Sequence, residues 1–161
     1  MYHPRYFYIG LFVLVALVGT AFFVYRTSMP PTESAVQVPT AEFGGVSLRI
    51  DYATTTTARE RGLGGLDNIP NDYGMLFVFA KDDYYSIWMK DMLVPIDIFW
   101  LDSKGHVISI ARDVATSTFP NVFHPTEPAR YVLETAAGFA QEHSIMIGTP
   151  LLLKNLPIVS E

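Results

Sequence analysis

The chain has 161 residues, half of them hydrophobic, with a formal net charge of −5 and no cysteine. This length accommodates one folded domain with short appendages. The absence of cysteine excludes disulfides, thiolate metal sites, thiol catalysis and a lipid-modified cysteine anchor.

The first 26 residues predict a short tail followed by a transmembrane helix. Residues 6–25 carry no charge, and a helix of that length spans roughly 30 Å, one hydrocarbon core. Aromatic residues flank both ends of the run, as at the two membrane interfaces. A cleaved signal peptide is the alternative, because residues 19–21 (Gly-Thr-Ala) resemble a cleavage site. The apolar run exceeds the usual signal core, so the retained helix is the prediction.

Charge and orientation restrict the partners of the remaining chain. A short tail before a first span commonly stays in the cytoplasm, which predicts a single-pass plasma-membrane protein with an extracytoplasmic domain. All sixteen acidic residues but only nine of the eleven basic ones follow residue 26, which leaves a formal charge of −7 there. No basic stripe exists to release counterions, so a nucleic-acid partner is excluded.

The predicted domain organisation has four parts. Residues 1–26 are the tail and membrane helix, 27–41 a Pro-rich linker, 42–156 the soluble domain and 157–161 a C-terminal tail. Strands are predicted over residues 46–52, 75–79, 84–90, 95–101, 106–111, 130–134 and 149–153, and short helices over 58–61 and 137–143. The fold class is therefore mainly β, a compact sandwich or open barrel with two short helices. Residues 81–83 are interpreted as a turn, and 113–128 as a long polar loop.

Six short motifs follow one another in this soluble part. They are Arg61 to Leu63, Gly74 to Phe79, Trp88 to Lys90, Pro95 to Asp97, Asp102 to Gly105 and Tyr131 to Gly138. In this order they resemble the bacterial and archaeal family called domain of unknown function 192. The resemblance covers roughly residues 46–153. It implies a small mainly β domain behind one N-terminal span or signal, and it implies no known biochemical activity.

Three positions depart from the family pattern. The family usually has Met after Arg-Gly-Leu and Arg two positions later, where this chain has Gly64 and Leu66. After Trp-Met-Lys the family prefers Asn, and this chain has Asp91. These changes move the predicted site toward negative charge and argue against an anion-binding role that depends on the missing arginine.

Charged residues among apolar strands mark the candidate ligand-binding site. Trp88, Lys90, Asp91 and Asp97 lie in or between two strongly apolar runs, where a buried charge costs several kcal/mol unless it is paired. On a strand, Trp88 and Lys90 would share one face, with Asp91 on the other. Asp97 is expected to pair with Lys90 or Arg61. Two interpretations remain open: a ligand pocket beside Trp88, or a structural network of ion pairs.

Glu134 is the fifth candidate. It ends an apolar strand ahead of the predicted helix around Gly138. The favoured interpretation is that it caps the N-terminus of that helix, which attracts negative charge. The alternative is that it serves the same pocket as Lys90.

Other chemistries find little support in the sequence. His106 and His143 are isolated and Pro125 interrupts the spacing of His124 and Glu127, so no metal site and no cofactor are predicted. No serine-nucleophile motif is present. Catalytic residues therefore stay unassigned.

Three functions are compatible with these features. The leading hypothesis is a membrane-anchored extracytoplasmic domain that binds a small polar ligand or an envelope partner without catalysis. An envelope hydrolase or lyase with Lys90 and a carboxylate as its acid–base pair is the first alternative. A structural or assembly module is the second.

Overall fold

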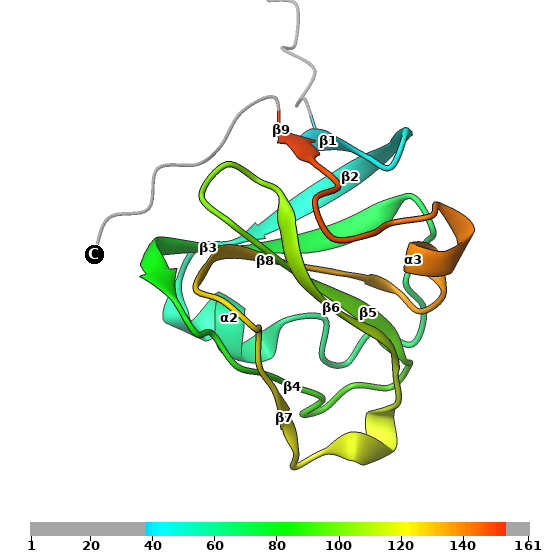
Figure 1. Ribbon diagram of the computed structural model, residues 1–161. Coiled ribbons are helices and arrows are strands. Elements are labelled where there is room, and N and C mark those ends of the chain that lie inside the picture. The colour runs from blue at the N-terminus through cyan, green and yellow to red at the C-terminus, as the bar shows by residue number, and fades with distance from the viewer. Residues whose placement is uncertain (1–37, 154–161) are drawn as a thin grey trace, which may run out of the picture. The chain divides into compact units, whose positions relative to one another are not determined.

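The computed structural model describes residues 38–153, which form a mainly β domain (Figure 1). Seven strands form one sheet in the order β6-β5-β8-β3-β2-β1-β9, and β4 pairs with β7 in a separate ribbon. The strands are β1 (Thr40–Phe43), β2 (Val46–Ala53), β3 (Tyr73–Asp83), β4 (Ile87–Trp88), β5 (Ile96–Leu101), β6 (Val107–Val114), β7 (Val122–Phe123), β8 (Ala129–Ala136) and β9 (Leu151–Leu153). The connections contain helix α2 (Thr56–Arg61), helix α3 (Phe139–Glu142) and a 3₁₀ helix, η1 (Thr116–Thr118). The prediction of a mainly β fold with two short helices is confirmed.

Strands β2 and β3 form the one parallel pair in this described sheet. Parallel neighbours need a crossover connection, and helix α2 lies in that crossover. The helix begins where the threonine run predicts, because the Thr55 hydroxyl accepts a hydrogen bond from the Ala58 N–H at 3.1 Å.

The large sheet curls into a half-barrel. The Val107 N–H donates to the Thr149 carbonyl at 3.0 Å, and the Gly148 N–H donates to the Val107 carbonyl at 2.8 Å. These bonds join the start of edge strand β6 to the segment that leads into β9, the opposite edge. Of the two predicted architectures, the structure therefore favours the open barrel.

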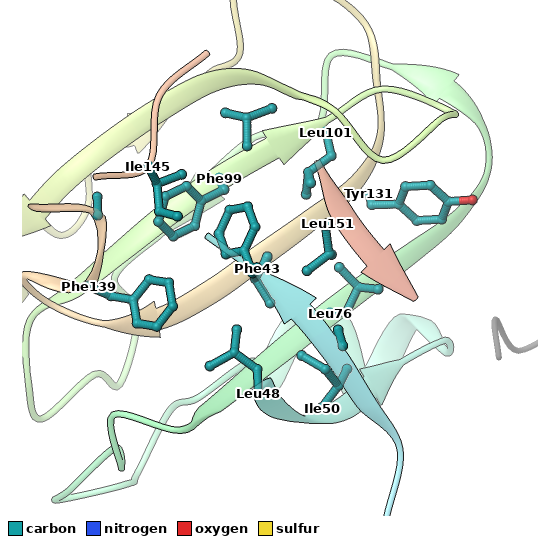
Figure 2. Packing of buried hydrophobic residues seen from close by; sticks show 14 of the residues in the cluster. Phe43, Leu48, Ile50, Leu76, Phe99, Leu101, Tyr131, Phe139, Ile145 and Leu151 are labelled. Atoms are coloured by element: carbon teal, nitrogen blue, oxygen red, sulfur yellow. The ribbon is translucent and has the colours of Figure 1, made fainter. Parts of the chain in front are cut away.

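Apolar side chains cover both faces of this sheet. On one face, which we call the α3-side core, the Phe43 ring meets Phe99 edge-on at 5.0 Å and stacks with Phe139 at 5.9 Å (Figure 2). On the other face, the α2-side core, Ile98 and Trp100 of β5 pack with Leu63, which follows α2. Every residue of β5 is buried, as expected of a strand that is apolar on both faces.

Two local predictions before β5 are wrong. Residues 81–83 do not form a turn, because β3 continues through Asp83 and the Asp82 carboxylate accepts from Arg130 of β8 at 2.6 Å. Cross-strand pairing here overrides the turn preference of the sequence. The expected strand over 84–90 is reduced to Ile87 and Trp88 of β4, and a turn follows at Lys90 and Asp91.

The predicted loop over residues 113–128 contains more structure than expected. Strand β6 runs through Val114, η1 follows, and β7 pairs with β4 in antiparallel register, with Val122 opposite Trp88. This pairing brings the segment beside the Trp88 motif.

Candidate functional site

A small cleft of about 40 Å³ lies on the α2 side of the sheet. We call it the Glu134 cleft, because Glu134 of β8 lies at its buried end. Its walls come from the end of helix α2 with the next two residues, from strand β4 and from the turn after β4. Apolar side chains, among them Phe77 and Ile87, line its interior, and Arg61, Trp88 and Lys90 line its exposed rim.

Glu134 is a buried carboxyl group that lacks a full set of partners. The residue is 4% exposed, and its Oε2 atom has no hydrogen-bond partner among the described residues. Burial raises the pKa of Glu134 to about 8, with a backbone hydrogen bond from Leu63 opposing the shift. Glu134 is therefore mostly protonated at neutral pH and presents a neutral carboxylic acid to the cleft.

The Arg61–Leu63 motif shapes the cleft around this acid. Gly62 ends helix α2 with φ 51° and ψ −137°, a combination that essentially only glycine adopts. A Cβ atom on Gly62 would lie 3.2 Å from both Glu134 Oε2 and Phe77 Cζ. The glycine thus permits the turn and leaves room over the carboxyl group.

Lys90 and Trp88 meet at the rim of the cleft, although not through strand alternation. The Lys90 Nζ atom lies 5.7 Å from the centre of the Trp88 ring, a cation–π distance. Phe119 approaches the same ring edge-on at 6.3 Å. The predicted sharing of one strand face is wrong for Lys90, because the chain has already entered the turn there.

Asp91 has a backbone role in that turn. Its φ is 58°, in the left-handed region where Asn and Asp are the most tolerated non-glycine residues. Its carbonyl accepts the Gly65 N–H at 2.9 Å. Asp91, Gly64 and Leu66 are not among the residues that line the Glu134 cleft, so the three departures from the family pattern lie outside its lining.

Asp97 is separated from the cleft by the sheet, and its predicted partners are wrong. Its two carboxylate oxygens accept backbone N–H groups, from Asp113 at 2.8 Å and from Ala140 at 2.7 Å. Neither Lys90 nor Arg61 pairs with it in the described structure. Asp97 therefore ties β6 and the first turn of α3 to the sheet, a structural function.

The prediction that Glu134 caps the helix near Gly138 is also wrong. The N-cap of α3 is Gly138, which has no side-chain cap, and the carboxylate that reaches the first turn of that helix belongs to Asp97. Glu134 lies on the opposite face, in the cleft that Lys90 also lines.

The cleft also includes residues that the sequence did not indicate. Arg59 lines it and is held by hydrogen bonds to the carbonyls of Thr54 at 2.7 Å and Val78 at 3.2 Å. Ser86 also lines the cleft, and its Oγ atom lies 2.9 Å from His124 Nδ1. The glycine after Arg61 was the one available signal for this region, because it marks a close backbone approach.

Several other predictions can be compared with the described residues. Lys90 forms no ion pair with a carboxylate within 4.0 Å there, and the carboxyl group that shares its cleft is Glu134. Within residues 38–153, no three His, Asp or Glu side chains gather as a metal site would require, and no helix is long and apolar enough to cross a membrane. The predicted membrane helix at residues 6–25 lies outside the described residues.

Two solved structures share this fold. A protein described as a putative transcription regulator from Sinorhizobium meliloti matches with a TM-score of 0.67 at 24% identity, over 71% of this chain and 92% of that one. A protein of unknown function from Novosphingobium aromaticivorans matches with a TM-score of 0.64 at 23% identity, over 77% of this chain and 93% of that one. At these identities the likeness concerns the fold alone.

The sequence then identifies the family. Residues 38–153 match DUF192, a family described as an uncharacterized ACR, and the chain belongs to that family. A UPF0127 protein from Thermococcus gammatolerans is 34% identical over 91 residues, which span 55% of this chain and 56% of that relative. The resemblance stated from the six motifs is thereby confirmed.

Proposed function

We propose that this protein is a membrane-anchored, extracytoplasmic domain that binds a small polar ligand in the Glu134 cleft without catalysis. The observation that carries the proposal is the unpartnered Oε2 atom of a buried Glu134, at the end of a cleft with Trp88 and Lys90 on its rim. An unsatisfied buried polar group costs about 1–3 kcal/mol. A ligand that hydrogen-bonds to it recovers part of that energy on binding.

The cleft suits the polar end of a ligand better than a large apolar body. A volume of about 40 Å³ holds one or two small functional groups, so the rest of a ligand extends over the rim. Trp88 is 43% exposed there, and a rigid aromatic ring offers contact area at little entropic cost. The carboxyl group of Glu134 inside the cleft and the ring of Trp88 at its rim together form a minimal recognition site.

A fragment screen by NMR on the isotope-labelled full-length protein in detergent tests the proposal. We expect polar fragments that perturb the amides of Gly62, Leu63 and Glu134 together, with affinity lost in Trp88→Ala. Lys104→Ala, an exposed lysine away from the cleft, is the matched control and retains binding. The proposal fails if every binding fragment perturbs another region, or if Trp88→Ala binds as well as the unchanged protein.

The anchoring half of the proposal depends on the uncharged run of residues 6–25. Reporter enzymes that are active on only one side of the membrane, fused after the last residue, test the orientation. An exported reporter should be active and a cytoplasmic reporter inactive, with the protein in the membrane fraction. The opposite pattern would overturn the predicted orientation.

A protein of the envelope as the ligand is a second candidate, because apolar side chains surround the rim. Trp88 of β4, Phe119 just before β7 and Val122 of β7 are 43%, 46% and 46% exposed. A photo-crosslinking residue at position 122 should capture a partner protein in cells. The same crosslinking residue combined with Trp88→Ala should capture no partner. Capture that is unchanged in Trp88→Ala would count against this candidate.

A further inference from the structure

The charges around the Glu134 cleft differ from those on the rest of the described surface. Of the five other lysine and arginine side chains in residues 38–153, three have a carboxylate partner: Arg49 pairs with Asp72 at 2.9 Å, Lys81 with Asp83 at 3.8 Å and Arg130 with Asp82 at 2.6 Å, whereas Lys104 and Arg112 have none. Arg59, Arg61 and Lys90, which all line the cleft, have no carboxylate within 4.0 Å in the described part of the chain. Three cations without a carboxylate partner therefore gather at one cleft of a protein whose net charge is −5. Carbonyl groups hold Arg59 in place, so Arg61 and Lys90 are the two that remain open to a ligand.

These cations are not neutralised by the acidic residues of the cleft. Glu60 is exposed on helix α2, and it is the one other carboxylate in the lining. Glu134 contributes no negative charge at neutral pH, because burial raises its pKa to about 8. The lining therefore has three basic side chains against one ionised carboxylate, an excess of positive charge that favours an anion.

The interior of the cleft requires a different group. Leu63, Phe77 and Met92 line it, and a charged group placed among apolar side chains loses its hydration. A neutral carboxylic acid donates one hydrogen bond. The group that fits beside Glu134 is therefore an uncharged acceptor oxygen, such as a hydroxyl or a carbonyl.

Between the basic rim and the apolar interior of the cleft, the Trp88 ring offers a surface on which the carbon skeleton of a ligand can pack. It is partly exposed and has Lys90 over it at 5.7 Å and Phe119 at its edge. An inorganic anion would satisfy the cations and leave both this ring and Glu134 unused. The combination favours an organic molecule with several hydroxyl groups, whose C–H face packs on the ring.

Building on the proposed function, we infer that the ligand is a hydroxylated organic anion, a sugar acid or a sugar phosphate. It places a hydroxyl oxygen beside Glu134 and its anionic group against Arg61 and Lys90. Carboxylate and phosphate share this chemistry, and both are bound by lysine and arginine.

Titration calorimetry on the full-length protein in detergent tests this inference with four probes: glucuronate, glucose 6-phosphate, glucose and glucosamine. We expect one of the two anions to bind at least ten-fold more tightly than glucose, and glucosamine to bind most weakly. The anion that binds more tightly identifies the carboxylate or the phosphate as the natural group. An order in which glucose or glucosamine binds as tightly as both anions would overturn the inference.

Charge variants make the test specific to this cleft. Lys90→Gln and Arg61→Gln should each weaken binding of the preferred anion at least five-fold more than binding of glucose, whereas Lys104→Gln should change neither. Glu134→Gln should retain binding at pH 7, because the amide N–H replaces the acid O–H as donor, and Glu134→Leu should lose it. Equal anion affinity in Lys90→Gln, Arg61→Gln and the unchanged protein would refute the placement of the anion.

The inference and the proposed function fail separately. If no probe binds while the NMR screen finds neutral or cationic fragments at Gly62, Leu63 and Glu134, the ligand class is wrong and the binding function stands. If the screen also finds nothing at these amides, both are wrong.

Discussion

Each face of the described sheet contains one buried carboxyl group, and the two groups differ in how their oxygens are hydrogen-bonded. Asp97 of β5 and Glu134 of β8 are 1% and 4% exposed, and the strand register places Ile98 opposite Glu134. Asp97 lies on the α3 side with two backbone donors at 2.8 and 2.7 Å. Glu134 lies on the α2 side with an unpartnered Oε2 atom and a raised pKa.

Burial alone therefore does not distinguish a carboxyl group that can bind a ligand from one that stabilises the fold. A buried carboxylate with a main-chain donor on each oxygen has no unpartnered atom that a ligand would need to satisfy. A carboxyl group with a free oxygen at a cleft is an incomplete network that a ligand can complete. Hydrogen-bond satisfaction is therefore the property that separates Asp97 from Glu134.

Substitutions at these two residues should change stability in opposite directions, with the largest effect at Asp97. Asp97→Ala leaves the N–H groups of Asp113 and Ala140 without acceptors, at about 1–3 kcal/mol each. We expect the free energy of unfolding to fall by about 2–5 kcal/mol. Glu134→Gln should raise it at pH 7. Urea unfolding of the full-length protein measures both, and equal losses for the two variants would contradict the comparison.

The stability of the protein should also depend on pH through Glu134. The pKa of Glu134 is about 8 in the folded protein against an ordinary value of 4.5, so the folded state holds this proton more tightly. The stability contribution is therefore fully present below about pH 4.5 and is lost as pH rises to 8, at about 1.4 kcal/mol per pH unit at most. Burial, with a hydrogen bond to Asp51, raises the pKa of the neighbouring Tyr73 above its usual 10, so it does not titrate in this window.

Glu134→Gln removes this titration and provides the control. The stability advantage of Glu134→Gln over the unchanged protein should grow steadily from pH 5 to pH 8 and then level off. Groups common to both proteins, such as Asp102, cancel in the difference. A difference that stays constant from pH 5 to pH 9 would show that Glu134 is ionised throughout.

Filling the space over Glu134 should have an intermediate effect. Gly62→Ala forces an alanine into a glycine conformation and places its Cβ 3.2 Å from Glu134 Oε2. We expect a loss of about 1–3 kcal/mol in stability, together with loss of ligand binding. Gly65→Ala is the matched control, because its φ is also positive but its Cβ meets nothing within 4 Å. Unchanged ligand binding in Gly62→Ala would place the ligand elsewhere.

The smallest effect is expected at Asp91. Because its φ is 58°, Asp91→Ala should cost about 1 kcal/mol, whereas Asp91→Gly and Asp91→Asn should be nearly neutral or stabilising. Thermal unfolding compares the three variants, and ligand affinity should be the same in each. A marked change in ligand affinity in Asp91→Asn would instead show that Asp91 contributes to ligand binding, as the sequence predicted.

Elements defined by local pattern could be predicted from the sequence. The alternation from Val46 to Tyr52 and the apolar run up to Leu101 both became strands, and the threonine run supplied the cap of α2. In these elements, side-chain periodicity and capping chemistry determine the structure with little help from distant residues.

Features that depend on distant contacts could not be predicted. Asp97 is satisfied by a main-chain group 43 positions away, and the sequence contains no sign of a backbone donor. The turn at Lys90 follows from packing against the loop at Gly64 and Gly65. Trp88, Lys90 and Glu134 were identified as candidates from their residue types, but only the fold separates them from Asp91 and Asp97.

The hydrogen bond from the Gly65 N–H to the Asp91 carbonyl has a consequence for the two charged positions at the rim. It joins the loop after Arg61 directly to the turn that carries Lys90, so main-chain atoms set the separation of the two rim positions. Side chains at positions 61 and 90 are exposed and contribute nothing to that frame. Substitutions at positions 61 and 90 should therefore retain the fold, so any change in the proposed ligand binding would report on the side chains themselves.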